Sequence, residues 1–308
     1  GNKILDLSLE LRNSINKNYF SYFHIKPNNE SIFEPTHANF FETYFKNERN
    51  TIMVAYKNKT AHDFNQQIRK IKFPDAQHIT AGDHIIVGRN NYPHSIYNGE
   101  FGIVISSKSA VIKRNIPVYV NGEPKIIPMQ WRWVELLFKN EENNDKPVSG
   151  YMLENFLETD NNQLTSAEMR ALYIDFKIRN QNLTLGTPEF KDALKNDPFF
   201  NAIQLKYGYA VTCHKAQGGE WENVFVVWDY NLHKSFNVLT DKQTEQHKTN
   251  INFFRWAYTA VTRTRTKLFN LNPPSFSPFS SLIYVPSKIR KEQELQTGKT
   301  SKTLRIQL

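Results

Sequence analysis

The sequence contains a single cysteine, Cys213, among its 308 residues. An intramolecular disulfide is therefore impossible, and we expect a reducing, cytoplasmic environment. No apolar run approaches the roughly 18 residues of a membrane-spanning helix, and the first residues lack the apolar core of a signal peptide. These absences predict a cytoplasmic protein without a membrane partner.

The sequence also lacks a complete phosphate-binding loop. The segment "TGKT" at 297–300 ends like one, but the pattern G-x-x-x-x-G-K-[ST] requires a glycine where Gln293 stands. No apolar strand leads into this segment, so we interpret it as a chance match. No apolar strand ends in an Asp-Glu pair suited to Mg²⁺ either, and no metal site is predicted.

The chain does have an excess of positive charge. Lysine and arginine number 39 against 30 aspartates and glutamates, which gives a net charge of +9. Such an excess favours an anionic partner, most often nucleic acid, although an ordinary basic protein has the same balance. The length suits one large domain or two smaller ones.

The two ends of the chain have the pattern of an α/β fold. Residues 1–49 are predicted to be a mostly helical lead-in from a preceding domain. A buried strand at 50–56 precedes a helix at 58–71, and strands and a helix alternate again after residue 205. A strand followed directly by a helix is typical of a parallel sheet with flanking helices. A helix is predicted over 252–266 and a final strand over 267–273.

Residues 79–138 have a different pattern, with four short alternating strands separated by turn signals such as Asn121-Gly122. They predict a small antiparallel barrel inserted into the α/β domain. The α/β domain would then be discontinuous, covering 50–78 and 139–285, with a polar linker at 140–147. Residues 286–308 form a basic tail that we predict to be disordered.

The segment "GYAVTCHKAQGGEW" at 208–221 gathers several reactive residue types. Adjacent strand residues point to opposite faces, so Cys213 and His214 cannot readily act as nucleophile and base. One cysteine and one histidine also fall short of a zinc ligand set. Cys213 is therefore predicted to be a small buried apolar residue. The pattern is a strand that enters a glycine loop with an acid, where backbone and carboxylate can approach a ligand closely.

The segment "WAYTAVTRTRTKL" at 256–268 places two arginines at the end of the predicted helix. Arginines at this place can bind a phosphate in a bidentate manner, although a solvated helix face is the alternative. Arg263 and Arg265 would lie about 200° apart on a helix and could not share one face.

Together these segments resemble motifs V and VI of superfamily 1 DNA helicases, within the RecD-like group. "TIMVAYKNKTAHDFNQQI" at 51–68 resembles motif IV, and "AGDHIIVGRNNYPHSIYNGEFGIV" at 81–104 resembles the SH3-like barrel inserted in their second motor domain. The resemblance implies a RecA-like second motor domain of the P-loop NTPase type. It leaves residues 140–200 without an explanation.

The resemblance also implies an ATP site between two RecA-like domains. Arg263 would be the arginine finger that stabilises charge on the transferring γ-phosphoryl group. Glu220 would lie near the ribose, with Gly218 and Gly219 allowing close approach and Gln217 as a lesser candidate. The phosphate loop and the Mg²⁺ ligands would come from a first motor domain in cis, which these 308 residues lack.

Nucleic-acid contacts are implied at three places. Thr212 and His214 would face single-stranded DNA and couple the two sites, although a satisfied pair at a strand end is the alternative. Asn58 would be a motif IV contact. A loop of the predicted barrel could touch DNA by charge and stacking, or be an ordinary exposed loop; its residues are Arg89, Asn90 and Tyr92.

The resemblance predicts the C-terminal motor half of an ATP-dependent DNA helicase that acts in repair or recombination. It would move 5′ to 3′ on single-stranded DNA or from a duplex end, and the chain alone would not hydrolyse ATP. The start at Gly1 leads us to expect a longer parent. The alternative is a non-enzymatic nucleic-acid-binding or adaptor module that retains the helicase fold.

Overall fold

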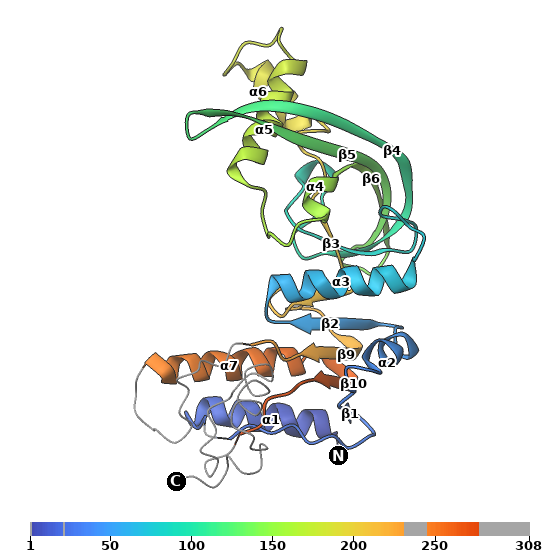
Figure 1. Cartoon of the computed structure of the whole chain (residues 1–308), viewed down its shortest axis with the longest axis vertical. Coiled ribbons are helices and arrows are strands. Elements are labelled where there is room, and N and C mark those ends of the chain that lie inside the picture. The colour runs from blue at the N-terminus through green and yellow to red at the C-terminus, as the bar shows by residue number, and fades with distance from the viewer. Residues whose placement is uncertain (1, 21, 231–244, 277–308) are drawn as a thin grey trace, which may run out of the picture. The chain divides into compact units, whose positions relative to one another are not determined.

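The computed structural model describes residues 2–20, 22–230 and 245–276 (Figure 1). The chain divides into two compact units. The first unit comprises residues 1–60 together with the segment from 211 onward, and the second unit comprises residues 61–210. The predicted basic tail at 286–308 and the "TGKT" segment lie outside the described residues.

The first unit is built on a five-stranded sheet. Its strand order is β1-β10-β9-β2-β8, and the pairs β1–β10, β10–β9 and β9–β2 are parallel. The strands are β1 (Ile32–Phe33), β10 (Thr264–Leu271), β9 (Trp221–Val227), β2 (Thr51–Ala55) and β8 (Ala210–Thr212). Every residue of β2 is buried, as expected for a parallel strand covered on both faces. The predicted α/β class with a parallel sheet is confirmed.

Helices α1 (Lys3–Asn16), α2 (Phe40–Lys46) and α7 (Glu245–Val261) belong to this unit. The Asn2 side chain accepts hydrogen bonds from the first backbone N–H groups of α1, which would otherwise lack partners. The buried face of α1, which includes Leu7 and Leu11, packs with α7. Because β1 also joins the parallel sheet, residues 1–49 are an integral part of this unit. The lead-in predicted at 1–49 therefore contains a strand of this sheet as well as helices.

The second unit contains an antiparallel sheet of order β6-β5-β4-β3-β7. Its strands are β3 (His84–Val87), β4 (Phe101–Val120), β5 (Glu123–Lys139), β6 (Asp145–Leu153) and β7 (Leu205–Tyr207), and β4 and β5 are long and strongly curved in Figure 1. The other elements are α3 (Asn58–Lys72, which begins in the first unit), η1 (Tyr92–His94), α4 (Glu154–Leu157), α5 (Ser166–Arg179) and α6 (Pro188–Asn196).

This sheet extends beyond the predicted barrel at 79–138. The expected four short strands become β3 and two long strands, while the supposed linker at 140–147 contains a turn and the start of β6. A parallel bridge joins Met152 to Ile203 next to β7, so the two edges of the sheet approach each other. Residues 139–209 therefore belong to the same compact unit as the antiparallel sheet.

The outer half of the β4–β5 hairpin carries three prolines on one face. Pro117, Pro124 and Pro128 lie opposite Ile126, Tyr119 and Asn115 in alternate pairs. Among the described residues, no third strand pairs with this half of the hairpin, so a proline whose nitrogen points away from the partner strand removes no ladder hydrogen bond there. They also block further strand pairing along both edges.

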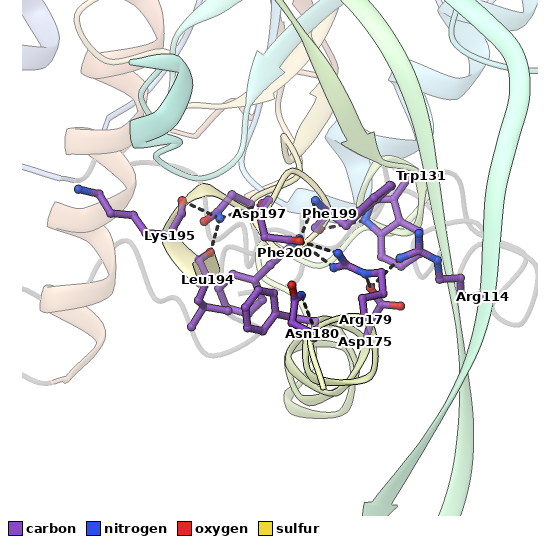
Figure 2. A network of polar contacts seen from close by, with 12 residues as sticks. Arg114, Trp131, Asp175, Arg179, Asn180, Leu194, Lys195, Asp197, Phe199 and Phe200 are labelled. Carbon is purple, nitrogen blue, oxygen red and sulfur yellow. Dashed lines mark hydrogen bonds and ion pairs between the residues drawn. The ribbon is translucent and has the colours of Figure 1, made fainter. Parts of the chain in front are cut away.

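A charged network joins this hairpin to α5 and the segment after α6 (Figure 2). Arg179 contacts both carboxylate oxygens of Asp197, at 2.6 and 2.8 Å, and Asp175 at 2.8 Å. Arg114 from β4 lies 2.8 Å from Asp175. The two guanidinium groups lie 4.2 and 4.8 Å from the centre of the Phe199 ring. Both buried carboxylates are thereby paired, as burial demands.

We expect this network to make stability depend on acid pH. Burial alone would raise the pKa of Asp197, but the hydrogen bonds from Arg179 and nearby backbone amides outweigh it and lower the pKa below its ordinary value. Asp197 therefore contributes stability above about pH 4, the ordinary pKa of aspartate, and this contribution is lost as the pH falls through its lower folded-state pKa. Asp197→Asn should flatten the decline in unfolding free energy below about pH 4, measured by urea titration. Asp192 is exposed and supplies the control. The unfolding free energy of Asp192→Asn should decline with falling pH as that of the wild type does.

Candidate functional site

The loop between β8 and β9 holds most of the predicted nucleotide residues. After Thr212 the chain turns tightly, and the N–H groups of Lys215 and Ala216 donate to the Thr212 carbonyl at 2.9 and 3.1 Å. Gly218 has φ +83°, a conformation that a residue with a Cβ adopts only under strain. A Cβ on Gly219 would collide with the Trp221 ring. The two glycines are thus required by the turn and by close packing at the start of β9.

Arg263 lies directly against this loop. Its guanidinium donates to the carbonyl oxygens of Gly219, at 3.0 Å, and Thr259, at 3.1 Å, and contacts the Thr262 hydroxyl at 3.2 Å. The Arg263 carbonyl accepts from the Trp221 N–H at 2.9 Å, where β9 and β10 begin. Among the residues that the structure describes, no carboxylate lies within ion-pair distance of Arg263. The half-buried cation is therefore held only by uncharged oxygens.

The predicted helix over 252–266 ends earlier, at Val261. Arg263 lies in the turn that follows and Arg265 lies in β10, so the argument from helix faces was wrong. The chain leaves the helix here because Thr264 already pairs with Trp221 as a strand residue. Arg265 contacts Glu220 at 3.0 Å, and both side chains are more than half exposed. An ion pair so exposed contributes little stability.

The strand-end residues separate into buried and exposed ones. Cys213 is buried and its thiol lies 3.7 Å from the Trp256 carbonyl, and burial raises its pKa to about 12. The prediction of a small buried residue is confirmed, and both the burial and the raised pKa disfavour the thiolate form that a nucleophile requires. Thr212 is only 8% exposed, which argues against a direct DNA contact and for a role in shaping the turn. His214 and Gln217 are exposed.

Lys215 is a residue of this loop that sequence reasoning missed. It is half-buried, and this burial lowers the pKa of its ammonium group. Lys215 is thus a second basic group at this loop, besides Arg263. Because a buried cation is costly without a partner, an anionic ligand would stabilise its charged form. Its burial follows from the turn after Thr212, which the sequence pattern did not reveal.

The remaining predicted contacts lie elsewhere. Asn58 is exposed at the start of α3. Arg89, Asn90 and Tyr92 are exposed in the loop after β3 of the second unit, with Tyr92 71% exposed. The Asn90 side chain accepts from the Asn98 N–H at 2.8 Å, which orders this loop.

Two further findings concern the described residues as a whole. Within these ranges no group of three or more His, Cys, Asp or Glu side chains is placed to hold a metal ion. None of the described helices is both long and apolar enough to cross a membrane.

Comparison with known proteins points to the same segment. Residues 207–269, which include the β8–β9 loop and Arg263, match the family model of the UvrD-like helicase C-terminal domain. A comparison with curated proteins gave no match.

Solved structures of helicases show a more distant similarity. The Pif1 helicase from Bacteroides in complex with ADP-AlF3 and ssDNA is 10% identical, with a TM-score of 0.36 over 97% of this chain and 55% of that chain. The Pif1 helicase from Candida albicans is 14% identical, with a TM-score of 0.30 over 97% of this chain and 58% of that chain. The chain thus spans little more than half the length of these proteins.

Proposed function

We propose that this chain is the C-terminal motor domain of an ATP-dependent superfamily 1 DNA helicase. In this proposal the parent is RecD-like, moves 5′ to 3′ on single-stranded DNA and acts in repair or recombination, and the second unit corresponds to the inserted SH3-like barrel. The observation that carries the proposal is the position of Arg263. Its guanidinium lies on the Gly219 carbonyl inside the segment that matches the helicase family model.

The residues present fit one side of a nucleotide. Among the described residues, the donors of Arg263 contact only uncharged oxygens, so phosphate oxygens would be stronger partners. Gly218 is exposed and offers backbone without a side chain. Glu220 would leave its exposed contact with Arg265 at little cost. A phosphate cradle and Mg²⁺ ligands would have to come from a first motor domain outside these 308 residues.

In the assembled cleft, Arg263 would approach the γ-phosphoryl group and stabilise the negative charge that develops on it during transfer. The loop from His214 to Glu220 would connect this event to DNA. It begins at the carboxyl end of β8 and ends where Arg263 contacts Gly219. A shift of Arg263 toward the phosphate would therefore change the hydrogen bonds of that loop.

The proposal is tested with the full-length protein and with this chain alone. We expect ATP hydrolysis by the full-length protein to be stimulated by oligo(dT), and this chain alone to hydrolyse no ATP. Duplexes with either a 5′ or a 3′ single-stranded tail then report polarity, and the 5′-tailed duplex should be unwound. Hydrolysis by the chain alone, or full-length protein that is inert with DNA, would contradict the proposal.

The second candidate is a non-enzymatic nucleic-acid-binding module. The exposed loop with Arg89, Asn90 and Tyr92 and the net charge of +9 favour it. An immunoblot of the source cells distinguishes the two candidates. A band near 36.1 kDa, together with salt-sensitive DNA binding that needs no ATP, would support the module. A band larger by roughly one domain of 150–250 residues would support the helicase.

A further inference from the structure

Two tyrosines meet at the carboxyl edge of the parallel sheet. Tyr56 follows β2 directly and Tyr230 lies just beyond β9, and these strands are parallel neighbours. Their ring centres are 4.2 Å apart, with an angle of 43° between the ring planes. Tyr56 is 39% exposed. A large aromatic ring therefore lies partly open to solvent, with a second ring behind it.

Packing and hydrogen bonds restrict the positions of both tyrosines. Tyr230 packs against Phe253 and Trp256 of α7, with ring centres 5.4 and 5.8 Å away. The backbone at Tyr56 is fixed by Asp229, whose carboxylate accepts hydrogen bonds from the Tyr56 N–H at 2.6 Å and the Lys57 N–H at 3.1 Å. The ring orientation is thus set by packing and backbone bonds, so little entropy is left to lose when a ligand stacks on it.

This edge also holds two of the predicted nucleic-acid residues. The Cys213 N–H donates to the Ala55 carbonyl at 3.0 Å, which brings the next residues, His214 and Tyr56, to the same edge. Asn58 follows two residues after Tyr56. In open sheets with parallel strands, ligands bind outside the carboxyl ends of the strands.

Arg263 and Glu220 lie at the opposite edge, where β9 and β10 begin. The seven residues of β9 separate the two edges by about 20 Å at roughly 3.3 Å per residue. The two edges therefore suit different ligands. The tyrosines suit a ring that stacks on them, and Arg263 suits a phosphate chain.

We propose that Tyr56, supported by Tyr230, is a stacking platform for a base of single-stranded nucleic acid. This inference rests on the proposed function and assigns a ligand to a surface beside it. Stacking accepts any base, as a motor that moves along a strand requires. The exposed side chains of Lys57 and Lys59 add positive charge to the same segment.

The test measures binding of fluorescein-labelled oligo(dT) to the 308-residue chain by fluorescence anisotropy at low salt. Tyr56→Ala should weaken binding by about 5- to 150-fold, the loss expected for one stacked base, whereas Tyr56→Phe and Tyr56→Trp should retain it. Tyr22, exposed to 46% in the same unit, supplies the matched control Tyr22→Ala, which should bind as the wild type does.

A direct readout does not depend on the stability of any variant. Oligo(dT) that carries 5-iodouracil is irradiated with the wild-type chain, and mass spectrometry should locate an adduct on Tyr56. Adducts found only on other residues would overturn the platform, as would unchanged affinity of a folded Tyr56→Ala chain or equal losses in both alanine variants. These outcomes leave the helicase proposal intact. A wild-type chain that binds no oligo(dT) would instead remove both the platform and the DNA contacts proposed for this chain.

Discussion

Arg263→Ala in the full-length protein should lower ATP turnover by about 10³-fold or more, with little loss of ATP affinity. The guanidinium would act mainly on charge that develops during phosphoryl transfer, so its loss affects the transition state more than the bound nucleotide. Steady-state hydrolysis with saturating oligo(dT) measures the turnover, and a fluorescent ATP analogue measures the affinity. Arg263→Lys should have little more turnover than Arg263→Ala, because an ammonium group lacks the bidentate geometry of a guanidinium group.

Arg265→Ala is the matched control for this variant. Arg265 lies two residues away, carries the same charge, and makes an exposed side-chain contact with Glu220. We expect its turnover to remain within a few-fold of the wild type. Near-normal turnover of Arg263→Ala, or equal losses in the two variants, would remove the assignment of Arg263 as the arginine finger.

Asp175→Ala should destabilise the second unit by about 3–5 kcal/mol. The Asp175 side chain is 5% exposed and contacts both Arg114 and Arg179. Its removal leaves Arg114 without its carboxylate in a partly buried position, while Arg179 retains Asp197. Urea unfolding gives the free energy, and hydrogen exchange of α5 and the β4–β5 hairpin should show that the loss is located there.

The control for Asp175 is an ion pair of similar geometry on the surface. Lys139 and Asp145 are 2.5 Å apart, with side chains 56% and 62% exposed, so Asp145→Ala should cost less than about 1 kcal/mol. If Asp175→Ala and Asp145→Ala lower the unfolding free energy by the same small amount, the network around Asp175 does not hold the hairpin to α5.

Local sequence patterns predicted the parts of the fold that depend on nearest neighbours. The apolar runs around Met53 and Phe225 identified buried parallel strands, because such strands are covered on both faces. The environment of Cys213 was also predictable, since an isolated cysteine without ligand partners packs as an apolar residue. The two motif segments that contain Gly219 and Arg263 were recognised from their residues, and the structure brings them into contact.

Features that depend on distant partners could not be predicted in the same way. The end of α7 at Val261 follows from the pairing of Thr264 with Trp221, 43 positions earlier in the chain. The length of β4 and β5 was hidden because the prolines on their exposed face interrupt the alternating pattern.

The sequence by itself determined the α/β class, the buried strands and the residue types that a nucleotide and a nucleic acid would need. Only the tertiary structure decided which of those residues meet. Arg263 reaches Gly219, Arg265 reaches Glu220, and Tyr56 joins Tyr230, each across more than 40 positions of the chain. Local preferences act over a few residues, whereas such contacts are set by strand register in the sheet, which no short segment contains.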